Sequence, residues 1–224
     1  MSFIDDLAAR LKQPLPGAEA QLNMSPRQAR ARPLTQDAPP DVRHAAALIL
    51  LYEMNNEWHL PLTVRRDDLV HHPGQISLPG GGIDEGEMAE AASLREAEEE
   101  IGVDPSSVRI LGSLTPLYVI VSGFVVTPFV GVVDRRPAFR PEAREVAEIL
   151  EVPLSQLTDP ARRMRGNRTR EGYLIDFPYF KVEDLAHPLV RRSLGEGGSH
   201  GDGGPSHQVW GATAMMLSEF VELL

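Results

Sequence analysis

Residues 81–103 read GGIDEGEMAEAASLREAEEEIGV and carry a clear helix signal. The part from 87 to 101 is rich in Ala, Glu and Leu, which favour the helical conformation. Gly102 follows directly and Pro105 comes soon after, as expected where a helix ends. The sequence therefore predicts a helix over 87–101.

Three glutamates of this helix lie on one face, because Glu96, Glu99 and Glu100 are spaced at i, i+3 and i+4. Ala97 and Ile101 lie on another face, which can pack into a core. Neighbouring carboxylates repel one another by roughly a few tenths of a kcal/mol per pair, and a divalent cation relieves that repulsion. Such hard oxygen ligands suit Mg²⁺ or Mn²⁺. A run of glutamates is more often a solvated helix face, so the surrounding residues must decide.

The surrounding residues favour a functional site. The helix follows the loop LPGGG at 78–82, where glycines let the backbone approach a ligand closely. The segment 81–103 has one fixed pattern. Five residues separate Gly81 from Glu87, and seven residues separate Glu87 from REAEEEIGV at 95–103. This pattern matches the Nudix box in full, so the chain resembles the Nudix hydrolase superfamily.

The resemblance implies an α/β fold in which a mixed β-sheet is sandwiched between α-helices. It also implies metal-dependent hydrolysis of a nucleoside diphosphate that is linked to a further group. Arg95 would orient the acidic cluster, Gly80 would offer its carbonyl, and Glu87 would be a helix start, an ion-pair partner or an outer ligand. Glu96 and Glu100 would be catalytic, and the implied metal ligands are Glu96, Glu99 and Glu100.

Residues 62–81, LTVRRDDLVHHPGQISLPGG, resemble the coenzyme A diphosphatase branch of this superfamily. The stretches at 14–26 (PLPGAEAQLNMSP), 122–131 (SGFVVTPFVG) and 209–214 (VWGATA) resemble the same branch. The branch implies cleavage of coenzyme A or acyl-coenzyme A to 3′,5′-ADP and (acyl-)4′-phosphopantetheine. The implied substrate-binding residues are Arg65, Gln75, Gly80 and Gly81.

Three positions depart from the branch pattern: Arg66 replaces a small residue, Val70 an arginine and Leu78 a phenylalanine. The missing arginine matters because it could contact a substrate phosphate. His71, His72 or Arg66 could take its place, although a histidine lacks the planar fork of an arginine. Two alternatives therefore stay open: hydrolysis of ADP-ribose, NADH or a nucleoside triphosphate, or nucleotide binding without catalysis. Lost box glutamates would indicate the second, and none is lost here.

Several single residues have both a functional and a structural interpretation. Arg65 binds phosphate or merely ends a strand. Glu145 precedes an apolar stretch, where the superfamily often keeps a carboxylate that serves as metal ligand or general base, and a surface carboxylate is the simpler interpretation. Trp210 is expected to anchor packing, with base stacking as the alternative. His200 and His207 lie near glycines that are too mobile to preorganise a zinc site.

The composition limits the function further. The chain has 224 residues, no cysteine and a formal net charge of −10. Disulfides, thiolate metal sites and a cysteine nucleophile are excluded, and non-specific nucleic-acid binding is not expected. No apolar run reaches membrane-spanning length, and the first residues lack the pattern of a secretory signal. We expect a soluble, cytoplasmic enzyme that acts on a small-molecule nucleotide, with a homodimer left open.

The remaining segments complete the predicted domain organisation. Residues 1–41 are interpreted as a helix over 3–12 followed by an extended arm, and 42–224 as one Nudix domain with a mobile glycine-rich loop at 192–207. Strands are predicted at 45–52, 59–65, 108–114, 125–133 and 173–179, and a strand or short helix at 146–152. Helices are predicted at 155–164, with a break at Pro160, and at 210–224.

Overall fold

The central strand β2 (Arg43–Met54) explains how the chain builds two hydrophobic layers. The computed structural model describes residues 2–28, 39, 41–66, 68, 74–170, 173–183 and 206–224. Side chains alternate along a strand, so Leu48, Leu50 and Tyr52 enter a cluster with Ala97 and Ile101 of the acidic helix. The alternate residues, which enter the second and larger cluster on the opposite face, are Ala47, Ile49 and Leu51.

Within the described residues, the helices and strands follow the chain in a mixed α/β order. Helices are α1 (Phe3–Arg10), α2 (Gly17–Leu22), α3 (Ala89–Ile101), α4 (Leu154–Thr158) and α5 (Gly211–Val221), with 3₁₀ turns η1 (Pro105–Ser107) and η2 (Pro160–Arg162). Strands are β1 (Arg27–Gln28), β2, β3 (Glu57–Arg65), β4 (Ile76–Ser77), β5 (Gly80–Gly82), β6 (Arg109–Ser113), β7 (Leu117–Val119), β8 (Phe124–Val132), β9 (Val146–Pro153), β10 (Arg163–Arg170), β11 (Tyr173–Glu183) and β12 (Ser206–Trp210).

The large sheet is mixed. Among the described residues it has the order β4-β3-β2-β8-β6, with β5 paired to β2, β7 to β8 and β9 to β3. β2 runs parallel to β8 and antiparallel to β3, which it meets through a turn at Asn55 and Asn56. Both asparagines have positive φ, as this tight hairpin turn requires. The strand predictions at 45–52, 59–65 and 125–133 are therefore confirmed, and 146–152 is a strand.

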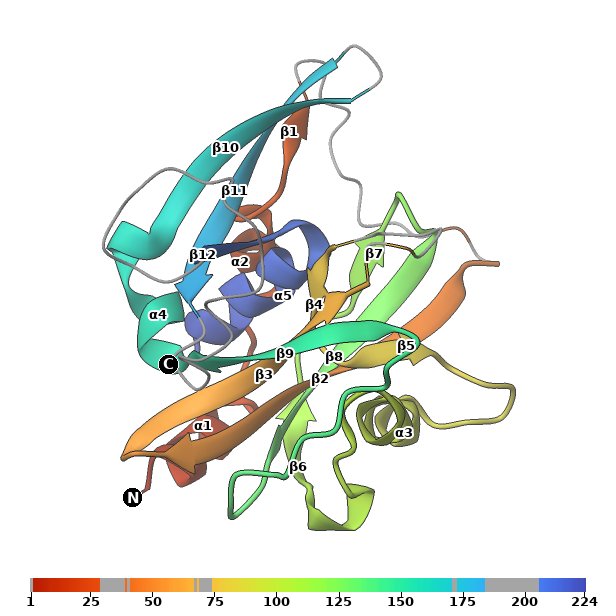
Figure 1. Ribbon diagram of the computed structural model, residues 1–224, viewed down its shortest axis with the longest axis vertical. Helices are drawn as coiled ribbons and strands as arrows, with labels where there is room; N and C mark the ends of the chain where they lie inside the picture. Colours follow the sequence, from red (N-terminus) through yellow and green to blue (C-terminus); the bar gives the residue numbers. More distant parts are fainter. Residues whose placement is uncertain are drawn as a thin grey trace.

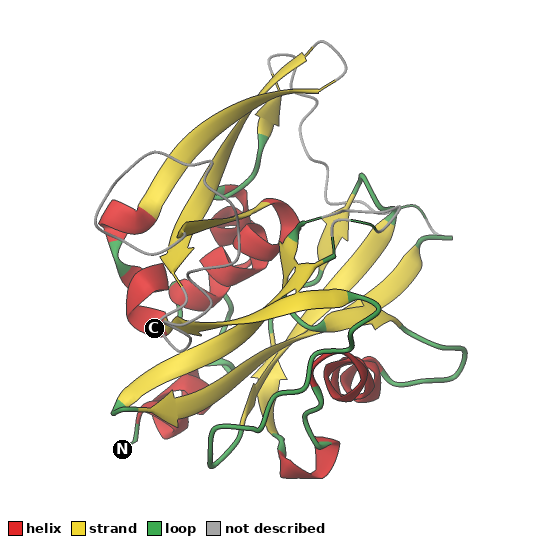
Figure 2. Ribbon diagram, in the orientation of Figure 1, coloured by secondary structure: helices red, strands yellow, loops and turns green. Residues whose placement is uncertain are grey.

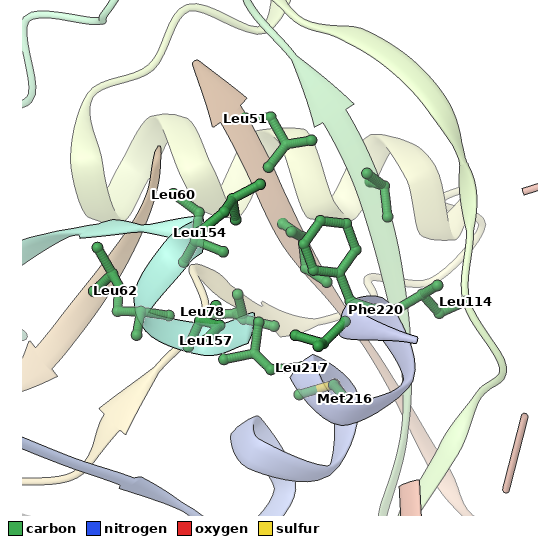
Figure 3. Close-up of a cluster of buried hydrophobic side chains, with 14 of the residues drawn as sticks. Leu51, Leu60, Leu62, Leu78, Leu114, Leu154, Leu157, Met216, Leu217 and Phe220 are labelled. Atoms are coloured by element: carbon green, nitrogen blue, oxygen red, sulfur yellow. The ribbon is translucent and has the colours of Figure 1, made fainter. Parts of the chain in front are cut away.

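Helices cover both faces of this sheet, as the predicted sandwich requires. α3 packs against β2 and β5 on one face, and α5 lies on the other (Figure 1). The close-up in Figure 3 shows Met216, Leu217 and Phe220 of α5 among leucines from the sheet and α4. The fold expected from the sequence is thus confirmed.

A second antiparallel sheet extends away from the first one (Figure 2). β11 pairs with β10 along one side and with β1 and β12 along the other. The predicted helix at 155–164 ends at Thr158, close to the expected break at Pro160. Its continuation is wrong, because Pro160 begins the 3₁₀ turn η2 and Met164 already pairs with Tyr179 of β11. Pairing with a distant strand outweighs the local helix signal in this segment.

The N-terminal segment is only partly as expected. The helix at 3–12 is confirmed as α1, and Ser2 and Asp5 form a capping box at its start. The extended arm over 13–41 is wrong at α2, whose Gln21 side chain donates to the buried carboxylate of Glu219 on α5 (2.7 Å). A helix of six residues shows no clear period, and this tertiary contact stabilises it. The division at residue 41 stays a prediction.

The C-terminal helix is confirmed as α5, although Trp210 belongs to β12 rather than to the helix. Most of the glycine-rich loop, with His200, lies outside the described residues, and His207 lies in β12. In the part of the chain that the structure describes, no helix has the length and apolar character needed to cross a membrane.

Candidate active site

The described residues that line one cleft, at the C-terminal half of α3, are all glutamates. The three box residues that the sequence placed on one helix face are brought together there with two carboxylates of the β8–β9 connection. The lining residues are Glu96, Glu99, Glu100, Glu142 and Glu145.

Glu100 is the most buried of these carboxylates, with 7% of its surface exposed. Burial raises the pKa of Glu100 to about 7, and the charge of Glu96 adds to this effect, whereas the Gly80 N–H and Arg65 oppose it. The Gly80 N–H donates to Glu100 Oε2 at 3.2 Å. The described contact of Gly80 is therefore made by its N–H rather than by the expected carbonyl.

Glycine is required at both positions that face these carboxylates. A Cβ on Gly80 would lie 2.4 Å from the Ala46 carbonyl oxygen, because β5 passes close to β2. A Cβ on Gly81 would lie 2.5 Å from Cδ of Glu96. Burial also raises the pKa of Glu96, although its hydrogen bond with Arg95 opposes the rise.

Arg95 ties the acidic residues to the glycine strand. Its guanidinium donates to both oxygens of Glu87 (2.9 and 3.0 Å), to Glu96 (2.8 Å) and to the Gly82 carbonyl (2.9 Å). It also approaches Glu99 at 3.4 Å. These partners raise the pKa of Arg95, and Arg95 in turn lowers the pKa of Glu87. Among the roles left open for Glu87, the structure therefore shows the ion-pair partner.

The connection from β8 to β9 brings the remaining carboxylates to the cleft, and it passes close to α3 (Figure 2). The N–H of Arg140 donates to the Ile101 carbonyl and the N–H of Glu142 to the Glu100 carbonyl, both at 2.9 Å. Carbonyls at a helix end lack partners within the helix, so this connection caps α3 while it positions Glu142. Sequence reasoning missed Glu142, and its only local signal is a carboxylate three residues before Glu145.

Nearer to β8, side-chain contacts with Glu151 of β9 and Tyr52 of β2 hold the same connection. Arg136 donates to both oxygens of Glu151 on β9 (2.6 and 2.5 Å), and Tyr52 also donates to Glu151 (2.7 Å). Phe139 packs edge-on against Tyr52, with ring centroids 5.5 Å apart. We call the part of this connection that carries Glu142 and Glu145 the acidic wall, and these contacts hold the connection at both of its ends.

Arg65 lies at the end of β3, beside the cleft. Its guanidinium is 4.0 Å from Glu145, and its Nε is buried with no hydrogen-bond partner among the described residues. Its backbone N–H donates to the Gln75 carbonyl at 2.9 Å. Two of the expected substrate-binding residues, Arg65 and Gln75, therefore lie next to each other beside the cleft. Val70, His71 and His72 lie outside the described residues.

The residues of the cleft fit a hard divalent cation. Each lining side chain among the described residues offers carboxylate oxygens, and a cation would relieve the cost of ionising buried Glu100. Over the described ranges, no three acidic or histidine side chains form a ready-made metal site. Glu96 is turned toward Arg95, and Glu100 toward the Gly80 N–H. A cation would therefore have to draw these carboxylates toward itself.

The comparisons with known proteins agree with this geometry. The NUDIX domain model matches residues 42–172. A protein of Yersinia enterocolitica named "Uncharacterized Nudix hydrolase NudL" is 43% identical over 156 residues, which cover 66% of this chain and 79% of that protein. A protein of the same name from Pectobacterium atrosepticum is 45% identical over 98 residues, 43% of this chain and 50% of the relative. The chain thus matches half to two thirds of the length of several of these relatives.

Solved structures give a weaker likeness. A Nudix hydrolase from M. smegmatis, RenU, has a TM-score of 0.45 at 25% identity and covers 51% of this chain and 72% of that chain. A MutT/nudix family protein from Enterococcus faecalis has a TM-score of 0.46 at 15% identity and covers 98% of this chain and 73% of that chain. The family model covers more than half of the chain, and it coincides with the intact box and the glutamate cleft. The chain therefore belongs to the NUDIX domain family.

Proposed function

We propose that the chain is a pyrophosphohydrolase that cleaves the diphosphate bond of coenzyme A or acyl-coenzyme A, giving 3′,5′-ADP and (acyl-)4′-phosphopantetheine. The observation that carries this proposal is the cleft in which the buried box carboxylate Glu100 lies with four further glutamates. A site of this composition repels an anionic diphosphate unless a cation lies between them. The proposed activity therefore depends on a divalent metal ion.

Nudix hydrolases generally use divalent metal ions, and we propose Mg²⁺ or Mn²⁺ for this chain. Glu96, Glu99 and Glu100 would hold the ion, with Glu142 and Glu145 on the facing wall. When bound, the ion neutralises charge on the diphosphate and lowers the pKa of an attacking water.

The side chains of the cleft supply the remaining functions. Glu145 is half exposed and only loosely paired with Arg65, and these two observations support it as the carboxylate that would accept the proton of the attacking water. Glu96 is the alternative base, although Arg95 holds it more tightly. The guanidinium of Arg65, which is partly exposed beside Glu145, would donate to a substrate phosphate oxygen. Arg95 keeps the acidic face oriented throughout.

The substrate class is inferred from the segment around β4. Arg65, Gln75, Gly80 and Gly81 match the coenzyme A branch and lie in or beside the cleft. The departure at Val70 favours a second candidate, a different nucleoside diphosphate derivative such as ADP-ribose or NADH. A cytoplasmic location and a homodimer stay predictions.

Product analysis by chromatography tests the proposal. Purified protein with Mg²⁺ or Mn²⁺ is offered coenzyme A, ADP-ribose, NADH and a nucleoside triphosphate in parallel. We expect 3′,5′-ADP from coenzyme A well ahead of the other products. Faster cleavage of another substrate would support the second candidate, and no cleavage of any substrate would support a binding module without catalysis.

A further inference from the structure

The second sheet carries aromatic side chains on the face that points away from the main core. Trp210 pairs with Tyr179 in the register of β12 and β11, and Phe177 stands two residues further along the same face of β11. The rings of Phe177 and Trp210 have centroids 5.0 Å apart, and those of Phe177 and Tyr179 are 6.1 Å apart. Gly166 on β10 leaves room for Phe177, whose Cζ would lie 3.0 Å from a Cβ there.

An arginine lies over this aromatic surface. The guanidinium of Arg168 on β10 stands 4.9 Å from the centre of the Trp210 ring. Arg168 is exposed, and the described part of the chain gives it no carboxylate partner, whereas Arg165 on the opposite face of the same strand forms an ion pair with Asp176 (2.5 Å). We call Phe177, Tyr179, Trp210 and Arg168 together the aromatic face.

The aromatic face lies next to the elements that bear the cleft. Trp210 is the last residue of β12 and directly precedes α5, whose Thr213 donates to the Ile76 carbonyl of β4 (3.1 Å). Ile76 follows Gln75, whose carbonyl accepts the backbone N–H of Arg65 beside the cleft. β4 therefore lies between Arg65, at the edge of the cleft, and the end of β12 that carries Trp210.

We propose that the aromatic face binds the phosphorylated nucleoside half of the substrate, a suggestion that rests on the proposed function. The partly exposed indole of Trp210 and the exposed guanidinium of Arg168 above it offer flat surface to a nucleobase, and the buried ring of Phe177 supports the indole from within the sheet. The guanidinium of Arg168 can both stack on a base and donate to a phosphate oxygen. In a chain of net charge −10, a cation without a carboxylate partner in the described residues is complementary to an anionic occupant.

Tryptophan fluorescence tests the aromatic face without turnover. The chain has two tryptophans, so Trp58→Phe leaves Trp210 as the only one, and Trp58 packs instead against Phe3 of α1. The probes are adenosine 3′,5′-bisphosphate, adenosine and inorganic phosphate, each titrated into the Trp58→Phe protein. We expect saturable quenching by the bisphosphate at lower concentration than by adenosine, and none by inorganic phosphate.

Two arginine variants of the same strand separate a specific contact from a general charge effect. Arg168→Met, in the Trp58→Phe background, should weaken bisphosphate binding roughly tenfold or more, because it removes both the phosphate donor and the stacking plane. Arg165→Met is the matched control on the opposite face, and it should bind like its parent. Equal weakening by both variants, equal binding by Arg168→Met and its parent, or no quenching at all would overturn the proposal.

Steady-state kinetics provide a second measurement. In otherwise unchanged protein, Arg168→Met should raise KM for the cleaved substrate about tenfold, with kcat changed less than about twofold, because uniform binding energy is lost away from the reacting bond. An unchanged KM would contradict a role of the aromatic face in substrate binding. Absence of any hydrolysis would contradict the proposed function instead, and the quenching titration would still decide on the aromatic face.

Discussion

The carboxylate of Glu96 lies directly against the Cα of Gly81, so closely that a methyl group there would stand 2.5 Å from Cδ and from one oxygen of Glu96. The glycine strand and the acidic helix are therefore fitted to each other at the residue that is proposed to bind metal. Gly81→Ala should push the flexible Glu96 side chain aside and leave the backbone intact. We expect kcat to fall about a hundredfold, as for other small displacements of catalytic groups, with little change in the urea midpoint.

Gly80→Ala is the contrasting variant. Its Cβ would meet the Ala46 carbonyl at 2.4 Å and the Cα of Ala47 at 2.7 Å, which are backbone atoms that cannot turn away. This change should lower the free energy of unfolding by roughly 1–3 kcal/mol. Equal losses of stability in the two variants, measured by urea unfolding, would show that Gly81 is needed for the fold rather than for the position of Glu96.

Burial of Glu100 predicts a stability gain when its charge is removed. The pKa of Glu100 is raised from 4.5 to about 7 in the folded protein, so the unfolded chain ionises it first as pH rises. Below about pH 4.5 both states hold the proton, and Glu100→Gln should unfold like the parent. Between that pH and about 7 the parent loses stability relative to the variant, and above it the difference should level off at roughly 3 kcal/mol. Urea unfolding of metal-free protein at pH 5 and pH 8 measures this, and a pH-independent difference would contradict the assignment.

Arg95→Lys should be far from conservative. The planar guanidinium donates four hydrogen bonds from three separate nitrogens, to both oxygens of Glu87, to Glu96 and to the Gly82 carbonyl, whereas an ammonium group has three donors on a single nitrogen. We expect turnover to fall roughly ten- to a hundredfold, with the protein still folded. Turnover and near-ultraviolet circular dichroism measured on the same preparation separate these effects. If the lysine variant turned over substrate as fast as the parent, the orientation of Glu96 would not depend on the planar guanidinium of Arg95.

The Arg136–Glu151 ion pair anchors the acidic wall. Loss of this ion pair should lower the free energy of unfolding. Glu151 is 1% exposed, so Arg136→Met would remove the guanidinium that donates to both oxygens of a buried carboxylate. We expect a loss of roughly 3 kcal/mol in the free energy of unfolding. The double variant Arg136→Met with Glu151→Met should recover part of that loss, because no buried charge then remains. A double variant less stable than the single one would argue against this explanation.

The parts of the fold that could be predicted are those whose signal is local. α3 has a long helical period and glycine and proline at its end, and β2 is an unbroken apolar run. β10 has the sequence RMRGNRTR, without apolar alternation, and it becomes a strand because β11 pairs with it along its whole length. α2 depends in the same way on its hydrogen bonds to Glu219.

The candidate site likewise contains residues that a local pattern predicts and residues that it does not. Glu96, Glu99 and Glu100 share a helix face, so their spacing alone predicts that they lie together. Glu142 reaches the cleft through backbone hydrogen bonds to the end of α3, which no local pattern encodes. The position of Trp210 beside Arg168 likewise depends on the register of three strands.

The most direct test of the central claim is the turnover of Glu100→Gln. Coenzyme A is incubated with equal amounts of parent and variant protein in Mg²⁺, and 3′,5′-ADP is measured by chromatography. Glutamine keeps the shape of the side chain and can still accept the Gly80 N–H, but it removes the charge that the metal would bind. We expect a folded variant whose turnover is lower by orders of magnitude, and turnover equal to that of the parent would contradict a metal-binding role for Glu100.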